Sequence, residues 1–211
     1  MQTLRSNQTI VAPDLLLDGR LALFHRREKW LAIADLHFGY ELSQRAAGRL
    51  TPLWGMATAR ERLLQLLREY LPERLVIVGD VVHDRAGAAS AAKFLEELEE
   101  VCAVTLIAGN HDREIGRRFQ TVNSWSSSEF LFHHGHCAAA DPGARIQIIG
   151  HHHPAGVLHD GAGLRLKCPA FVQQERCWIM PAFSPWAAGA SWPKEDADRV
   201  WLCTPKRVLA L

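Results

Sequence analysis

Five short apolar runs in this chain each end in a cluster of aspartate, asparagine or histidine residues, and this recurrence constrains the fold more than any other feature. The runs have the length and composition of buried β-strands. Nine of the 11 histidines lie in the five clusters. The clusters are Asp35-x-His37, Gly79-Asp80-x-x-His83, Gly109-Asn110-His111-Asp112, His133-His134-Gly135-His136 and Gly150-His151-His152-His153. Because ligands of open α/β sheets bind beyond the carboxyl ends of the strands, we expect the five clusters to face one point.

The order of the predicted elements indicates an α/β fold. The first half of the chain alternates strands with amphipathic helices, and the second half is rich in hairpin signals. The predicted strands are 30–34, 75–78, 104–107, 130–132 and 146–149. The predicted helices are 56–71 and about 88–101, and the predicted hairpin turns lie at 18–19, 173–176 and 204–207. This order predicts either a sheet that becomes mixed or a second sheet that packs on the first.

Composition limits the class of protein. The chain has 211 residues, of which 48% are hydrophobic and 22% are charged, so it is expected to bury its own core without a structural metal or disulfides. The 24 Lys and Arg against 23 Asp and Glu give no support to a strongly basic nucleic-acid coat, although a local patch can still bind. Without an internal repeat or a linker-like segment, residues 1–211 are expected to form a single domain.

The cysteines and the apolar runs indicate the compartment. The five cysteines are widely spaced and contain no C-x-x-C, so we expect them to be reduced and packed as small hydrophobes. No segment resembles a signal peptide, and no apolar run approaches the ~20 residues that span a bilayer. We therefore expect a soluble, cytoplasmic protein that binds no membrane.

The five clusters carry the ligands of a divalent metal. Neutral imidazole and carboxylate together suit a borderline metal ion, and ligand sets of N and O atoms without Cys favour Mn, with Fe, Zn or Ni as alternatives. Seven ligands exceed what one tetrahedral site needs, so two ions are expected, and the carboxylate of Asp80 is the natural bridge. Two metals ~3.5–4 Å apart form the clamp used for in-line displacement at phosphorus.

In this order across residues 35–153, the five motifs resemble the signatures of the calcineurin-like metallophosphoesterases. Within that superfamily the chain is similar to the small bacterial ligase-associated DNA-damage-response endonucleases. The segments that carry the narrower resemblance are Ala34-Asp35-Leu36-His37-Phe38-Gly39, Gly109-Asn110-His111-Asp112-Arg113 and the tail Met180-Pro181-Ala182-Phe183. The resemblance implies a four-layer α/β/β/α sandwich of mixed sheets.

The resemblance also implies roles for individual residues. The first metal would be held by Asp35, His37 and His153 and the second by Asn110, His134 and His151, with Asp80 bridging the two. His111 would contact the phosphate and protonate the leaving oxygen, and Asp112 would accept a hydrogen bond from His111. The sequence leaves open whether His133 or His134 is the ligand, and the glycine that follows favours His134. His83 is interpreted as a supporting residue or a cap, while His136 and His152 stay open between solvent and substrate.

The function implied by the resemblance is hydrolysis of a phosphodiester by metal-bound hydroxide, with His111 as the general acid. It also implies DNA as the substrate, a role in repair, and an ATP-dependent DNA ligase with its associated helicase and nuclease as partners. One alternative is a phosphatase or nucleotide phosphodiesterase that acts on small molecules. Another is a non-catalytic scaffold for partner proteins.

Three further features of the sequence have open interpretations. Arginines after two of the motifs contact flanking phosphates or are simply solvated; they are Arg45, Arg49, Arg113, Arg117 and Arg118. The tail tryptophans stack on bases, pack in the core or form a homodimer interface; they are Trp178, Trp186, Trp192 and Trp201. The segment 39–52 is long for a connection and is a candidate lid over the site.

Overall fold

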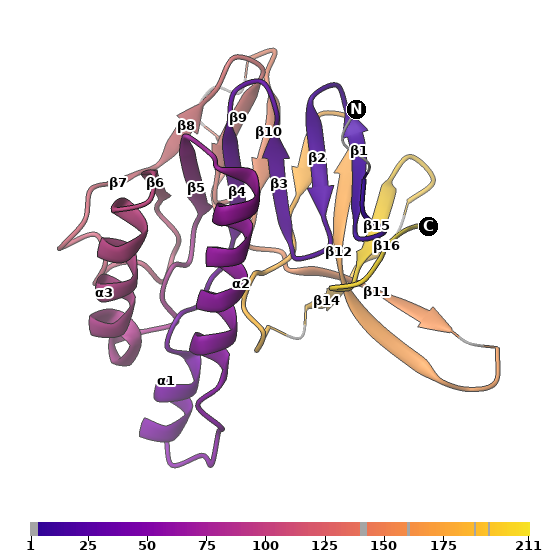
Figure 1. Ribbon diagram of the computed structural model, residues 1–211. Coiled ribbons are helices and arrows are strands. Elements are labelled where there is room, and N and C mark those ends of the chain that lie inside the picture. The colour runs from indigo at the N-terminus through magenta and orange to yellow at the C-terminus, as the bar shows by residue number, and fades with distance from the viewer. Residues whose placement is uncertain (1–3, 140–142, 160, 188, 194) are drawn as a thin grey trace.

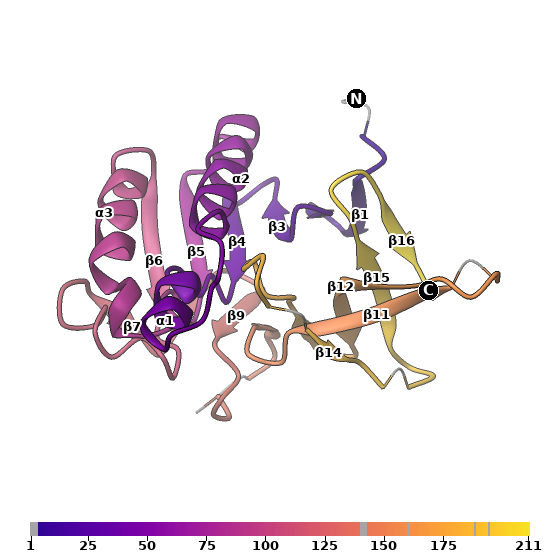
Figure 2. The ribbon, with the colours of Figure 1, turned by 90° about the horizontal axis from the view of Figure 1, so that it is seen from below.

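The protein consists of two mixed β-sheets packed face to face, with helices on one side (Figures 1 and 2). The computed structural model describes residues 4–139, 143–159, 161–187, 189–193 and 195–211. The first sheet runs in chain order through β1 (Gln8–Ala12), β2 (Leu15–Asp18), β3 (Ala22–His25), β4 (Trp30–Ala34), β5 (Arg74–Val78), β6 (Ala103–Ile107) and β7 (Thr121–Val122). Strands β1 to β4 are antiparallel to one another, whereas β4, β5, β6 and β7 are parallel.

The second sheet begins at residue 124 and contains the hairpins predicted at 173–176 and 204–207, whereas the hairpin predicted at 18–19 joins β2 and β3 of the first sheet. Its order is β14 (Ala190–Ser191), β11 (Pro154–His159), β12 (Arg165–Gln174), β13 (Cys177–Ile179), β10 (Ile146–Ile149), β9 (Phe130–His133) and β8 (Ser124–Ser126). Strand β15 (Arg199–Cys203) pairs with β12 and with β16 (Val208–Ala210). Of the two arrangements that the sequence left open, the structure therefore has a second sheet. The hairpin of β11 and β12 reaches away from the rest of the molecule (Figures 1 and 2).

The helices α1 (Tyr40–Ala46), α2 (Gly55–Tyr70) and α3 (Ala88–Glu99), with a short 3₁₀ turn η1 (Arg85–Gly87), cover the outer face of the first sheet. They lie on one side because β4, β5 and β6 are adjacent parallel strands in chain order, and crossovers of the usual right hand that advance in one direction place their helices on the same face. Helix α2 buries Leu63, Leu66 and Leu67, so the predicted amphipathic helix is confirmed. It ends at Tyr70, and its C-cap residue Leu71 takes a φ of 44° and is 74% exposed.

The expected α/β class with two mixed sheets is confirmed, and the layers differ in one respect. In the residues that the structure describes, every helix lies between Tyr40 and Glu99, so only one of the two expected helical layers is present.

The tail segment joins the carboxyl ends of the two sheets. The backbone N–H of Met180 donates to the carbonyl of Ile149 at the end of β10, and that of Phe183 donates to Ala34 at the end of β4. The N–H of Ser184 donates to Asp35. The segment Met180–Phe183, singled out in the sequence without a chemical role, thus connects the strand ends that carry two of the polar clusters.

The core is continuous between the sheets and includes two of the tail tryptophans. Trp178 and Trp201 are buried and stacked, with ring centroids 5.1 Å apart, which confirms the packing interpretation for this pair. The five cysteines are free thiols, and Cys168 and Cys203 are buried as expected, but Cys137 is exposed and does not pack as a small hydrophobe. No helix in the described part of the chain has the length and apolarity needed to cross a membrane.

Candidate metal centre

The polar clusters meet where the carboxyl ends of both sheets come together. In the first sheet, Asp35 directly follows β4, and Asp80 lies two residues beyond β5. In the second sheet, His134 directly follows β9, and the loop 151–153 begins two residues beyond β10, which is parallel to β9. The parallel pairing of these strands brings the residues after them to one edge, so the common point expected from the sequence exists.

The side chains form two neighbouring groups, each with three potential ligand atoms within 4.8 Å of one another. The groups are Asp35, His37 and His153, and Asp80, His134 and His151. A hydrogen bond of 3.0 Å between Asp35 Oδ1 and His134 Nε2 links them, and His37 Nε2 lies 4.0 Å from Asp80 Oδ2. The structure thus brings together six of the seven predicted ligands, all except Asn110, with Asp80 close to residues of both groups.

The backbone at this site is strained. Five of the nine non-glycine residues with positive φ in the described chain are candidate ligands: Asp35, His37, Asp80, His151 and His153, with φ between 42° and 66°. The left-handed region costs such residues about 1–3 kcal/mol each, and strain of this kind gathers at functional sites. Left-handed residues are needed here because a regular strand would direct successive side chains to opposite faces of the sheet, whereas these side chains face one point.

Two glycines allow the ligands to come together. Gly79 has a φ of 74°, and a Cβ on it would lie 2.1 Å from the ring of His134. A Cβ on Gly109 would lie 2.1 Å from Asp80 Oδ1. Any larger residue at either position would displace a candidate ligand.

The protonation of the group suits metal binding. Burial lowers the pKa of His37 to about 4, although the carboxylates of Asp35 and Asp80 act in the opposite direction, so its imidazole is neutral near pH 7. Burial also disfavours the charged form of His134, but its hydrogen bond with Asp35 and the nearby carboxylates outweigh burial and raise its pKa. A bound dication would take over the role of that proton, since both neutralise the two aspartates.

The donor set fits a pair of divalent cations. Asp35 and Asp80 are 0% and 3% exposed, and their only ion-pair partners among the described residues are histidines. Two buried carboxylates without a lysine or arginine leave negative charge that a metal ion would neutralise. His37 Nδ1 is buried without a hydrogen-bond partner in the described chain, so no hydrogen bond at Nδ1 fixes which ring nitrogen of His37 carries the proton.

His111 lies beside the two groups, and its partner differs from the expected one. Its Nδ1–H donates to the carbonyl oxygen of His83 at 2.8 Å, and its backbone N–H donates to Asp80 Oδ1 at 3.0 Å. Asp112 does not accept from the ring of His111. Its buried carboxylate accepts instead from the backbone N–H groups of Gly109 and Val82. The carboxylate of Asp112 points away from His111 because it satisfies one amide in its own turn and one in the loop after β5.

The structure also separates the adjacent histidines of the fourth cluster. His134 belongs to the second group, whereas His133 Nε2 lies 2.9 Å from Gln147 Oε1 on the neighbouring strand. His134 Nδ1 lies 2.9 Å from Nδ1 of the exposed His136. Sequence reasoning favoured His134 from the following glycine, but it gave no partner for either ring.

Asn110 and the arginines have fewer contacts. Asn110 is exposed, between two residues that touch Asp80: Gly109 through close packing and His111 through its backbone N–H. The arginines after the motifs are exposed or partly so, and Arg117 pairs with Glu114. Segment 39–52 forms helix α1 and then an exposed stretch in which Leu50 is 100% exposed.

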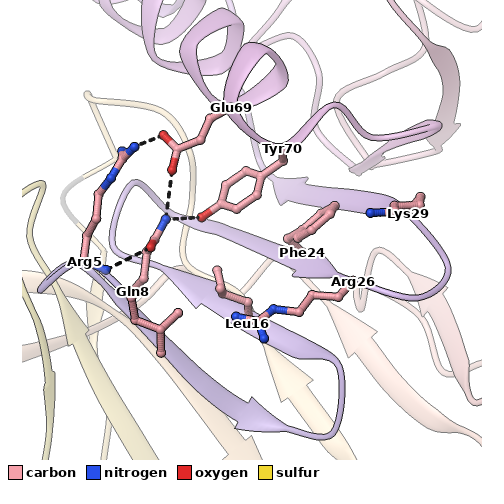
Figure 3. Close-up of a pocket in the computed structure, with 9 residues that line it drawn as sticks. Arg5, Gln8, Leu16, Phe24, Arg26, Lys29, Glu69 and Tyr70 are labelled. Carbon is pink, nitrogen blue, oxygen red and sulfur yellow. Dashed lines mark hydrogen bonds and ion pairs between the residues drawn. The ribbon is translucent and has the colours of Figure 1, made fainter. Parts of the chain in front are cut away.

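A separate cavity of about 370 Å³ lies at the amino end of β4, whereas the candidate metal centre lies at its carboxyl end (Figure 3). Phe24 and Tyr70 stack along its floor, with ring centroids 4.6 Å apart. Glu69 is paired with Arg5 on its wall. No candidate ligand lines it.

Comparison with known proteins agrees with this geometry. A family model described as the calcineurin-like phosphoesterase superfamily domain matches residues 29–172. The solved structure of the nuclease MPE of Pseudomonas putida is similar to this chain, with 28% sequence identity and a TM-score of 0.75. That match covers 93% of this chain and 94% of the nuclease.

A second solved structure, of Yfce, a phosphoesterase from E. coli, is 18% identical over 81% of this chain and 86% of its own. Its TM-score of 0.46 is too low to support an inference about this chain. No curated protein gave a significant match to the sequence.

Proposed function

This chain belongs to the calcineurin-like phosphoesterase superfamily and is a hydrolase of phosphoric esters, and from that premise we propose that it cleaves phosphodiesters in DNA with two divalent metal ions as cofactors. The observation that carries the proposal is the pair of Asp/His groups joined by the Asp35–His134 hydrogen bond, with His111 beside them. Mn²⁺ is the proposed metal because the ligand set combines imidazole and carboxylate without thiolate.

In the proposed site, Asp35, His37 and His153 would hold one ion, and Asn110, His134 and His151 would hold the other. Asp80 would be shared between the two. When bound, the two ions supply Lewis acidity to the phosphoryl oxygens and activate water near neutral pH. The chain itself contributes rigid placement, because the ligands stand on short loops directly after paired strands.

His111 is the proposed general acid. The Nδ1–H bond to the carbonyl of His83 fixes the ring and leaves Nε2 as the nitrogen that exchanges its proton. Nε2 donates that proton to the leaving oxygen, and the neutral ring keeps its Nδ1–H bond. Asp112 acts as a positioning residue, because its carboxylate holds the backbone of the turn that carries His111.

The proposed biological setting is DNA repair in the cytoplasm, beside an ATP-dependent DNA ligase and its associated helicase and nuclease. This setting rests on the motif resemblance to ligase-associated endonucleases. The similarity to the P. putida nuclease supports a polynucleotide substrate.

The first experiment compares a chromogenic phosphodiester with its monoester in Mn²⁺. The expected result is faster hydrolysis of the diester, followed by nicking of plasmid DNA. Faster hydrolysis of the monoester, with no nicking, would assign the protein to the small-molecule phosphatases. Absence of metal-dependent turnover on every substrate would favour a binding scaffold.

The role of His111 is tested through the leaving group. His111→Ala should lower cleavage of DNA, which releases an alkoxide, by about 10²–10⁴-fold. Release of p-nitrophenolate should fall much less, because this anion needs no proton. The matched control is His159→Ala, which removes another exposed histidine outside the site. Equal losses on both substrates would show that His111 acts in another way.

A further inference from the structure

A continuous series of aromatic rings extends from His111 to the surface. His83 stacks on His111 with centroids 5.6 Å apart, and Tyr40 contacts the ring of His83 edge-on at 4.7 Å. Tyr40 in turn lies 6.0 Å from Trp186, and Trp186 lies 4.6 Å from Trp54. The rings come from the loop after β6, the loop after β5, α1, the tail and the residue before α2, so five separate segments contribute to one surface beside the site.

The indole of Trp186 is held firmly in this series. Its Nε1–H donates to Glu41 Oε2 at 3.1 Å, and Glu41 Oε1 accepts from the backbone N–H of Met56 at 2.6 Å. Glu41 is only 1% exposed, so a carboxylate has been buried to hold one indole and the first turn of α2. Gly55 leaves the space that the indole occupies, because a Cβ at this position would lie 2.0 Å from Trp186 Nε1. This arrangement places a rigid indole at a partly open position.

The outer end of the series is exposed and apolar. Trp54 is 47% exposed and its neighbour Leu53 is 49% exposed, while Trp186 and Tyr40 are half-buried. Large apolar side chains exposed beside a catalytic site indicate a surface that a ligand covers. Two exposed cations stand on the neighbouring elements: Arg45 in the last turn of α1, the helix that begins at Tyr40, and Arg85 in η1, which contacts α1; neither has a carboxylate partner in ion-pair distance among the described residues.

We propose that Tyr40, Trp54 and Trp186 form a stacking platform for a nucleobase of the substrate next to the scissile phosphate. This inference rests on the proposed phosphodiesterase function and adds its recognition element. A base is the occupant that fits, because it is planar, stacks on indole and phenol rings, and is linked to the phosphate that His111 would contact. The flanking arginines match the charge of the neighbouring phosphates.

The experiment uses two oligonucleotides of equal length, oligothymidylate and its fully abasic counterpart, in Mn²⁺. The wild-type chain should have the higher kcat/KM on the base-bearing strand. Trp54→Ala should lower kcat/KM on that strand by about 5-fold to about 150-fold, the usual range for loss of one base stack. It should leave cleavage of the abasic strand unchanged.

Ile10→Ala is the matched control, because Ile10 is an apolar side chain on β1, outside the platform, whose 49% exposure nearly equals that of Trp54, so its removal should change neither substrate. Trp186→Leu should reproduce the effect of Trp54→Ala, provided that its thermal unfolding midpoint matches the wild type. If Trp186→Leu fails to fold, Trp54→Ala alone decides. Equal loss on both strands, or no loss on either, would overturn the platform.

Failure of the platform and failure of the proposed function give different results. Binding of the two labelled oligonucleotides in EDTA, measured by fluorescence anisotropy, tests stacking without turnover. Suppose that the wild type cleaves neither strand but binds the base-bearing strand more tightly, and that Trp54→Ala loses this preference. This result would support the stacking platform and refute the nuclease function. A dimer that Trp54→Ala converts to monomer, with equal binding of both strands, would show that a second copy covers this surface.

Discussion

Two clusters of buried carboxylates in the first sheet are neutralised in opposite ways. Asp18 ends a regular strand, β2, and its carboxylate accepts from the guanidinium of Arg20 at 2.6 Å and from the hydroxyl of Tyr70 at 2.6 Å. Arg20 also pairs with Glu69. Asp35 is equally buried, yet it has a left-handed backbone and only histidines as ion-pair partners in the described chain.

The difference separates a structural carboxylate from a functional one. Around Asp18 the chain supplies its own permanent cation, so the cluster is complete when the protein folds. Around Asp35 and Asp80 it supplies imidazoles, which are neutral donors when deprotonated, and thus leaves a place for an external cation. Substitutions in the two clusters should therefore affect different measurements.

The largest effect is expected from Asp80→Asn, which tests the carboxylate cluster of the candidate metal centre. Removing the bridging carboxylate should lower turnover by at least about 10³-fold, because metal ions contribute several kcal/mol to such transition states. The metal-free variant should unfold in urea with a free energy within about 1 kcal/mol of the wild type, since no fixed cation loses its partner. Metal content is measured by inductively coupled plasma mass spectrometry. Retention of two metals per chain with normal activity would refute the bridging role.

The converse result is expected from Asp18→Asn. Replacing the carboxylate leaves Arg20 with only Glu69 as partner and should lower the free energy of unfolding by about 3 kcal/mol. Metal content and turnover of the folded fraction should stay unchanged. The control is Glu129→Gln, which breaks an exposed pair with Arg27 and should cost less than about 1 kcal/mol. If Asp18→Asn loses metal instead, the division between the clusters fails.

Most of the elements and the location of the site were accessible from the sequence. Strand β4 was predicted with its observed bounds, and helix α2 within one residue at each end, because apolar periodicity reports burial directly. The five clusters predicted a common point because parallel strands must end at the same edge. The short strands β7, β8 and β14 were missed, since pairs of two or three residues leave no periodic signal.

Contacts inside the site were less accessible. The hydrogen bond between His111 and the carbonyl of His83 involves backbone, which a side-chain motif does not report. The positive φ of Asp35 and Asp80 also has no signal in residue identity, apart from the nearby glycine at 79. Trp186 could be assigned to the tail but not to the aromatic series, because its partners Glu41 and Gly55 lie more than 100 residues away.

An intermediate effect is expected from His136→Ala. This variant tests whether a residue that contacts a proposed metal ligand, but is not itself a ligand, also affects metal binding. His134 Nε2 faces the two aspartates, and its Nδ1 lies 2.9 Å from His136 Nδ1, so His136 fixes the tautomer that leaves Nε2 free for metal. Loss of such an outer partner should weaken metal affinity about 10- to 100-fold. Titration of Mn²⁺ followed by electron paramagnetic resonance measures the change. His159→Ala is the control, and equal weakening in both variants would contradict the role.

The smallest effect, and the last test of the comparison, is the pH dependence of stability at Asp18. Burial acts to raise the pKa of Asp18, but the hydrogen bonds from Arg20 and Tyr70 prevail and lower it below its usual value near 3.8. A carboxyl whose pKa is lower in the folded state stabilises the protein above its unfolded pKa and loses that contribution as the pH falls through its folded pKa. The difference in unfolding free energy between the wild type and Asp18→Asn should therefore be constant from pH 7 to about pH 5 and shrink below about pH 4. Urea denaturation of the two metal-free proteins at several pH values measures it. A difference that shrank near pH 6 instead would contradict the lowered pKa of Asp18, because a carboxyl group with a lowered pKa stays ionised at that pH.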